Sequence, residues 1–251
     1  MKITNKLTAL LFVALLVGCV SSAEVNQQAE NNYATMVKKA QDSHLIDNSS
    51  PTAKRIQNVF RIMVPYADKE NQTGQKFNWR LTVVKSQELN AWAMAGGKMM
   101  FYTGLVDKLH LTDDEIAVVM GHEMAHALQE HSKSAQNLGT MTTIIGGIAD
   151  VAASVALGAD TGGLFRTGMA LGVDMPYSRG NETEADEVGL ILMAKAGFNP
   201  QAAPNLWKKM QAASGSGGGG LLSTHPSDES RQANLQRLLP EAMKYYKPRK
   251  A

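Results

Sequence analysis

The segment HEMAH, residues 122–126, has the residue types and spacing of a zinc site. Residues four apart lie on one face of a helix, so the imidazoles of His122 and His126 can bind one metal ion, and Glu123 can reach a water beside it. The alternative interpretation is a solvated helix face that carries two histidines by chance. The apolar flanks (for example Ile116, Val119) argue against it, because two histidines inside a core need polar partners or a metal.

A catalytic zinc ion needs a third protein ligand and one position open to water. Cys19 is the only cysteine, so this ligand must be His, Asp or Glu. Glu182 and Asp186 are four residues apart and share a helix face. We expect Glu182 to bind zinc and Asp186 to hold a ligand imidazole by its second nitrogen, whereas Glu184 points away from Asp186 and fits less well. The alternative for Glu182 is an acidic first turn stabilised by the helix dipole.

Helix and strand patterns predict how these residues are positioned. The zinc motif lies in the strongest helix pattern, residues 111–132, where Thr112 and Glu115 form a capping box. The other predicted helices are residues 31–44, 51–68, 182–196, 199–213 and 226–239. The predicted strands are residues 80–85, 91–95 and 98–102, the last two joined by the glycine turn at residues 96–97. The expected fold class is α+β, mostly helical with a small β-sheet.

Further motifs accompany the zinc motif and the Glu182 helix in a fixed order. They are the NAWAMAGG…TGL segment of residues 90–105, the Ser-Arg pair at 178–179, and the His-Pro pair at 225–226 with Arg231. Together they resemble the membrane-associated gluzincin metallopeptidases of the HtpX, BepA and CAAX-prenyl-protease (Ste- and Oma-like) type, over roughly residues 81–237. The resemblance implies a zincin-like fold, one zinc ion per chain and cleavage of internal peptide bonds. BepA-like members carry a helical-repeat domain after the protease, whereas this sequence ends at Ala251, so the resemblance gives no support for partner docking of that kind.

The expected mechanism uses zinc held by His122, His126 and Glu182, with Glu123 as the general base for an attacking water. An extended substrate would pair by its main chain with an exposed edge strand that borders the zinc cleft. This predicted substrate strand comprises Asn90, Ala91, Trp92 and Ala93.

The role of His225 has three interpretations. It follows the glycine-rich stretch 214–220 and precedes Pro226, so it could be a turn or capping residue. By resemblance to the family's HP element it could instead donate a hydrogen bond to the oxyanion. It could also occupy the fourth zinc position at rest and keep the protease inactive, which we favour because the glycine loop allows movement. Arg231 is the other candidate for fourth ligand or oxyanion donor.

Two further histidines flank the zinc helix. His110 precedes the helix, and His131 lies nine positions after His122, a rotation of about 180° on a continuous helix. We therefore expect neither to share the metal face.

Residues 1–18 are typical of a lipoprotein signal peptide. Lys2 and Lys6 precede the apolar run 7–17, which is too short to span a membrane. Leu-Val-Gly-Cys at 16–19 resembles the bacterial lipobox, so we expect a lipid on Cys19, the alternative being an ordinary signal peptide with a chance cysteine. Val20 implies by resemblance the outer membrane. We predict an outer-membrane lipoprotein on the periplasmic face of the bacterial cell envelope.

Charge indicates which partners the 251-residue chain can bind, and composition indicates how it divides into segments. Of 25 Lys and Arg, two precede Cys19, which leaves 23 against 23 Asp and Glu and gives no support to nucleic-acid binding. We expect a tether (20–27) and helical segment over residues 19–50, and a zinc metallopeptidase domain over 51–251. The Gly- and Ala-rich stretch 141–172 contains Asp150 and Asp160, so we expect a buried hairpin or a flank that touches lipid rather than a membrane span.

The site residues predict a zinc peptidase, and the resemblance together with the expected lipid anchor implies an endopeptidase that cleaves unfolded or misassembled envelope proteins as quality control. One alternative is an envelope chaperone or binding module with little turnover, against which the intact Glu123 argues. The other is a zinc peptidoglycan hydrolase, which would suit the same location but not the resemblance of the Glu182 helix.

Overall fold

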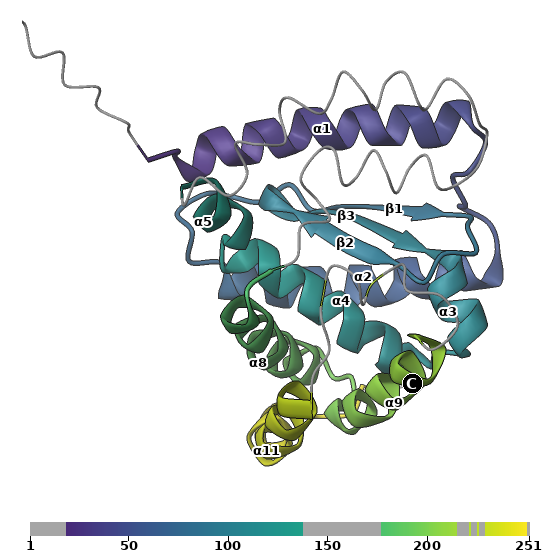
Figure 1. Ribbon diagram of the computed structural model, residues 1–251, viewed down its shortest axis with the longest axis vertical. Helices are drawn as coiled ribbons and strands as arrows, with labels where there is room; N and C mark the ends of the chain where they lie inside the picture. Colours follow the sequence, from purple (N-terminus) through teal and green to yellow (C-terminus); the bar gives the residue numbers. More distant parts are fainter. Residues whose placement is uncertain (1–18, 138–176, 215–220, 222–224, 226–228, 250–251) are drawn as a thin grey trace, which may run out of the picture.

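A mixed three-stranded sheet lies between helices on both of its faces (Figure 1). The computed structural model describes residues 19–137, 177–214, 221, 225 and 229–249. The predicted signal peptide, the stretch 141–172 and residues 215–220 of the glycine-rich loop lie outside the described residues.

The sheet has the strand order β1-β3-β2, so β2 is an edge strand. Strand β3 (Lys98–Tyr102) pairs in parallel with β1 (Arg80–Val84) and antiparallel with β2 (Ala91–Met94). The predicted hairpin is confirmed: β2 and β3 are joined by η1 (Ala95–Gly97), where Gly96 and Gly97 have positive φ angles that favour glycine. All five side chains of β3 are buried, because both faces of the sheet are covered.

Helix α1 (Ser22–Asp42) covers one face of the sheet. It begins with a capping box between Ser21 and Glu24 and buries one line of side chains, among them Tyr33, whose hydroxyl lies 2.7 Å from Thr82 Oγ1. The prediction that residues 20–27 form a tether is therefore wrong. The segment is polar overall, but its Val25 faces the sheet and is buried.

Helices α2 (Pro51–Glu70) and α4 (Asp113–Leu128) pack against the opposite face of the sheet, and the short α3 (Thr103–Leu109) leads from β3 into α4. Ser50 caps α2 and Pro51 occupies its first turn, as predicted. Nearly every side chain of α4 is buried, because α2, β2 and α8 (Arg179–Lys195) surround it. The zinc motif thus lies at the centre of the fold.

The predicted helix over residues 111–132 is wrong at its end. Helix α4 stops at Leu128, Glu130 adopts a left-handed conformation with φ 52°, and a separate helix α5 (His131–Asn137) follows. The chain therefore changes direction just before His131.

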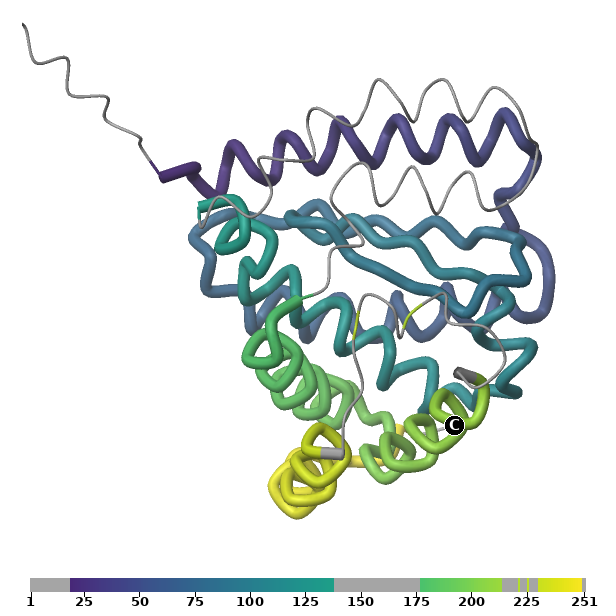
Figure 2. Tube along the Cα trace, viewed as in Figure 1, coloured from purple at the N-terminus to yellow at the C-terminus, as the bar shows by residue number. Residues whose placement is uncertain are grey.

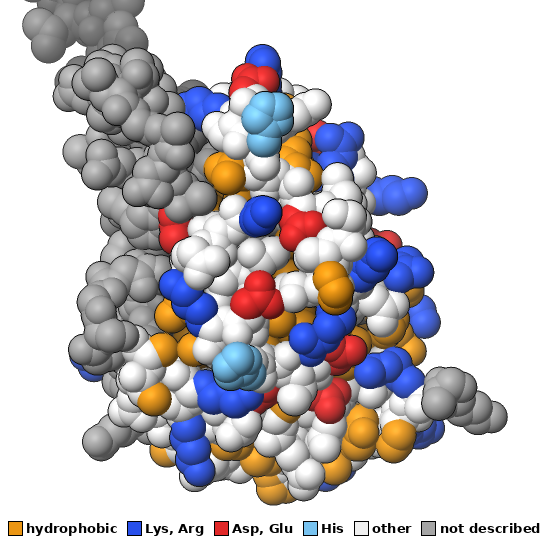
Figure 3. All heavy atoms as spheres, turned by 90° about the vertical axis from the view of Figure 1, so that its right-hand side faces the viewer, with side chains coloured by type: hydrophobic (Ala, Val, Ile, Leu, Met, Phe, Trp, Pro, Cys, Tyr) orange, Lys and Arg blue, Asp and Glu red, His pale blue; other side chains and the backbone are white. Residues whose placement is uncertain are grey.

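The C-terminal helices gather on the side of α4 away from the sheet (Figure 2). They are α8, η3 (Pro200–Ala202), α9 (Ala203–Ser214) and α11 (Glu229–Tyr245). The fold class is α+β and mostly helical, as predicted. Basic and acidic side chains are interspersed on the face drawn in Figure 3. Among the described residues, no helix combines the length and apolar character needed to cross a membrane.

Candidate metal centre

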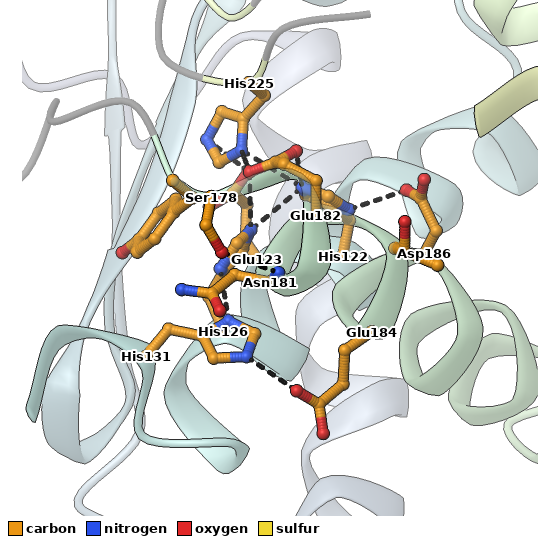
Figure 4. A network of polar contacts seen from close by, with 12 residues as sticks. His122, Glu123, His126, His131, Ser178, Asn181, Glu182, Glu184, Asp186 and His225 are labelled. Carbon is orange, nitrogen blue, oxygen red and sulfur yellow. Dashed lines mark hydrogen bonds and ion pairs between the residues drawn. The ribbon is translucent and has the colours of Figure 1, made fainter. Parts of the chain in front are cut away.

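Helix α4 presents two histidines from one of its sides (Figure 4). The Nε2 atoms of His122 and His126 lie 3.0 Å apart, and both side chains are buried. The capping box between Thr112 and Glu115 fixes the start of α4, with hydrogen bonds of 2.8 and 3.2 Å. The spacing of four residues thus brings the two imidazoles together, as the sequence predicts.

Helix α8 brings a carboxylate to the same point. Ser178 caps the helix, and Glu182 lies in its first turn, buried, with Oε1 3.4 Å from His126 Nε2 and Oε2 3.5 Å from His122 Nε2. The two helices can approach so closely because glycines face each other, Gly121 on α4 and Gly189 on α8. A Cβ on Gly121 would lie 2.6 Å from the Gly189 carbonyl oxygen. Because neither glycine has a side chain, the two helices lie close enough to set the spacing of the candidate ligands.

His225 completes the group from a distant part of the chain. Its Nδ1 lies 3.1 Å from His122 Nε2 and 2.9 Å from Glu182 Oε1, and its side chain is buried. The His225 amide donates to the Leu221 carbonyl, and the Leu221 amide donates to the carbonyl of Leu89, the residue before the predicted substrate strand. His225 is thus attached to the sheet next to β2.

The four side chains fit a zinc ion. With zinc–nitrogen distances of about 2.0–2.1 Å, the corners of a tetrahedral site are about 3.3 Å apart. The donor atoms of His122, His126, Glu182 and His225 are separated by 2.9–3.5 Å where they face one another, and all four lie within 4.8 Å. Ring nitrogens with facing lone pairs repel one another unless a proton or a cation lies between them. Imidazole and carboxylate are ligands that zinc prefers, so the group is suited to one zinc ion.

Glu123 lies beside this group and between it and the sheet. Its carboxylate is buried, and Oε1 accepts no hydrogen bond from the described residues, although His225 Nε2 lies 3.5 Å away. Burial raises the pKa of Glu123, while hydrogen bonding from the Ala93 backbone opposes that rise. A buried carboxylate with a raised pKa and a free oxygen is suited to accept a proton.

Asp186 contacts the candidate ligand His122 at Nδ1, the ring nitrogen that faces away from the ligand group. Its Oδ1 accepts a 2.9 Å hydrogen bond from His122 Nδ1, which orients the Nε2 atom of that ring towards the group, where it can bind a metal once it is free of a proton. Arg231 binds both oxygens of Asp186, at 2.7 and 2.8 Å, and its Nη1 lies 2.7 Å from Glu182 Oε2. The guanidinium therefore orients the two carboxylates, and this placement speaks against the predicted role of Arg231 as fourth ligand or oxyanion donor.

The charges of the group favour a cation. Burial opposes ionisation of Asp186, but the bonds from Arg231 and His122 outweigh it and hold its pKa below the usual value. Burial likewise works against protonated His122, yet Asp186 and Glu182 raise its pKa to about 10, whereas burial holds the pKa of His126 well below 6.5. The carboxylates of Glu182 and Asp186 face a single guanidinium, and the remaining negative charge holds a proton on His122, which a bound cation would replace.

His131 is not among the candidate ligands, as predicted, but the structure places it against the far side of the His126 ring. Its Nδ1 lies 2.8 Å from His126 Nδ1, and its Nε2 lies 3.1 Å from Glu184 Oε2. Tyr177, also missed, stacks on the His126 ring at a centroid distance of 4.0 Å. The expectation of a 180° rotation fails because α4 ends at Leu128; of the two histidines that flank the zinc helix, only His110 lies away from the group, with an exposed side chain.

The predicted substrate strand lies next to the site but is not exposed. Trp92 and its neighbours in β2 are buried, as is Asn90 just before the strand, which corrects the prediction of exposure. The strand borders α4, and the Ala93 backbone contacts Glu123. The edge strand therefore borders the candidate metal centre, as the sequence predicts.

Comparison with known proteins agrees with this geometry. The sequence profile of peptidase family M48 matches residues 51–239. The mitochondrial metalloendopeptidase OMA1 of Schizosaccharomyces pombe is 31% identical over 218 residues, covering 86% of this chain and 61% of the relative. The metalloendopeptidase OMA1 of Bos taurus is 33% identical over 179 residues, covering 67% and 34%. The beta-barrel assembly-enhancing protease of Escherichia coli is 30% identical over 164 residues, covering 61% and 33%.

The chain belongs to peptidase family M48. Metallopeptidases of this family use zinc, which is the metal that the His-His-Glu-His group fits. The chain spans less than two thirds of the length of these relatives.

Proposed function

We propose that this protein is a zinc-dependent endopeptidase that cleaves unfolded or misassembled proteins of the bacterial cell envelope. The observation that carries the proposal is the buried group of four zinc-binding side chains with the Glu123 carboxylate beside it. Family membership supports the reaction class, and the E. coli relative, by its name a protease that enhances β-barrel assembly, supports the substrate class.

The chain's own residues divide the reaction between them. His122, His126 and Glu182 hold the metal, and Asp186 keeps the ring of His122 oriented. Zinc, when bound, supplies Lewis acidity that polarises a carbonyl and acidifies a water. Glu123 takes the proton of the attacking water on its free Oε1 and later passes it to the leaving amine.

The substrate lies along the β2 edge in this mechanism. Among the described strands, β2 pairs only with β3, and its other edge runs beside α4. Because β2 is buried in this structure, the edge has to become accessible before a substrate can bind. An extended chain that then adds to the edge through main-chain hydrogen bonds would have its scissile carbonyl next to Glu123. Recognition through the main chain tolerates many sequences, which suits the cleavage of unfolded proteins.

His225 acts as a resting-state plug in this proposal. Its Nδ1 contacts His122 Nε2 and Glu182 Oε1, as a fourth zinc ligand would. It therefore occupies the position that a reacting water needs. Its attachment through Leu221 to Leu89 lies where a substrate would approach β2. Arrival of a substrate would therefore compete with the anchoring of the plug.

Lipidation of Cys19 would hold the protein at the outer membrane. Cys19 is exposed and lies two residues before the N-cap of α1, so the folded body would sit close to the lipid. We expect Cys19→Ser to move the protein from the membrane fraction to the soluble fraction without loss of cleavage in vitro. Retention in the membrane after washing with high salt would refute this anchor.

Turnover on defined substrates tests the proposed function. The purified chain should cleave unfolded casein, cleavage should stop with a zinc chelator, and Glu123→Gln should be inactive while it keeps its zinc. Cleavage of peptidoglycan fragments instead of casein would support the cell-wall hydrolase. Binding of casein without cleavage by the wild type would support the chaperone.

A further inference from the structure

The outer nitrogen of His126 faces another imidazole rather than a carboxylate or a carbonyl. His126 Nδ1 and His131 Nδ1 lie 2.8 Å apart, and His131 is buried, with 3% of its surface exposed. On its far side, His131 Nε2 lies 3.1 Å from Glu184 Oε2 (Figure 4). The three side chains form a line from α4 through α5 to α8.

The ring hydrogens of His126 and His131 can be assigned from the groups that the two histidines contact at either end, the candidate zinc ligands and Glu184. A neutral imidazole carries one N–H. The Nε2 atom of His126 faces the other candidate ligands and must be free of a proton to bind zinc, so Nδ1 carries the hydrogen and donates it to His131. His131 accepts at Nδ1, carries its own hydrogen at Nε2 and donates it to the Glu184 carboxylate.

We infer that His131 and Glu184 are positioning residues that hold His126 in the tautomer and orientation required for zinc. This inference rests on the proposed zinc endopeptidase and assigns a role to a pair that lies outside the ligand group. With this role, each of the two histidine ligands on α4 is oriented by a carboxylate of α8. Asp186 of α8 orients His122, and Glu184 of the same helix orients His126 through His131.

The backbone explains why His131 can reach His126. A continuous helix would carry His131 away from the metal face, since five residues rotate it by about 140° from His126. The left-handed Glu130, a conformation that non-glycine residues adopt at a cost, breaks the helix and turns His131 back. A backbone strained at this point is accounted for if the position of His131 serves the site.

Zinc affinity measured by competition with a chelating dye tests the inference. His131→Leu removes both hydrogen bonds and should weaken zinc binding about 10–100-fold, as loss of such supporting bonds does. His131→Asn keeps an acceptor near the Nδ1 position and should recover much of that loss. Glu184→Gln should weaken binding less than His131→Leu but more than the matched control Glu187→Gln, a half-exposed residue of the same helix.

A spectroscopic readout separates positioning from packing. In the zinc-loaded wild type, ¹⁵N-resolved spectra of the histidine rings should show His126 protonated at Nδ1 and His131 protonated at Nε2. An Nδ1-protonated His131, or unchanged zinc affinity in a folded His131→Leu, would overturn the inference. If His131→Leu does not fold, the other variants decide. The inference is then overturned if zinc binds with wild-type affinity to His131→Asn and to Glu184→Gln, as it should to the control Glu187→Gln. Neither readout requires turnover, so a chain that binds zinc but cleaves nothing would refute the proposed function alone.

Discussion

The contact between Gly121 and Gly189 predicts a stability change opposite to that expected from helix propensity. Replacing a glycine inside a helix by alanine ordinarily stabilises it by about 1 kcal/mol. At Gly121, however, the new Cβ would lie 2.6 Å from the Gly189 carbonyl oxygen, 0.8 Å short of the 3.4 Å at which ordinary contact begins. The obstacle is backbone, so α4 and α8 must separate.

The cost of that separation can be worked from the same distances. Overpacking of a well-packed core costs about 1–3 kcal/mol, and a clash between two backbones lies in the upper part of that range. After subtraction of the propensity gain, we expect Gly121→Ala to lower the free energy of unfolding by about 1–2 kcal/mol. Zinc ligands tolerate displacements of only about 0.2 Å, so moving Glu182 away from His122 should also weaken zinc binding.

Urea denaturation and chelator competition measure the two effects. The matched control is Gly180→Ala on α8, where a new Cβ meets nothing closer than Ser178 Oγ at 3.7 Å. The control should leave stability unchanged or raise it by up to about 1 kcal/mol, with zinc affinity unaltered. If Gly121→Ala is as stable as the control and binds zinc as tightly as the wild type, the close helix contact does not set the ligand spacing.

Three further predictions follow from single residues. His225→Ala should raise casein cleavage and self-cleavage if His225 is a plug; a fall of about a hundredfold with zinc retained would instead identify an oxyanion donor. Burial opposes ionisation of Glu115, but Lys209, the Thr112 amide and Asn205 outweigh it and lower its pKa. The stability that Glu115 contributes is therefore complete above its unfolded pKa near 4.5 and is lost as the pH falls through the lower folded pKa. In urea denaturation, the extra stability of the wild type over Glu115→Gln should shrink below about pH 4.5. A difference that stays constant with pH would contradict the assignment. Asp186→Asn should weaken zinc binding about 10–100-fold, and unchanged affinity would exclude its support of His122.

Local patterns carried most of the prediction of the site. The spacing of His122 and His126 and the capping box that starts α4 are properties of one helix, and the i,i+4 relation of Glu182 and Asp186 is a property of another. The hairpin of β2 and β3 is also local, since adjacent glycines form its turn. Each of these features depends on neighbours within a few residues along the chain.

The features that the sequence did not predict depend on contacts between distant segments. No glycine or proline marks the break after Leu128, so the turn that brings His131 to the site had no local signal. The polar start of α1 has the composition of a tether, and only the sheet that covers its few apolar residues makes it part of the folded body. The orientation of Arg231 depends on Asp186 and Glu182, two carboxylates of another helix.

Zinc content after dialysis tests the central claim most directly, because it separates metal ligands from the catalytic base. Wild type and Glu123→Gln should each retain about one zinc ion per chain, whereas Glu182→Gln should lose most of it under the same conditions. Glu187→Gln, on the same helix as Glu182, should retain zinc like the wild type. Loss of zinc from Glu123→Gln, or full retention by Glu182→Gln, would contradict the assignment of these two carboxylates.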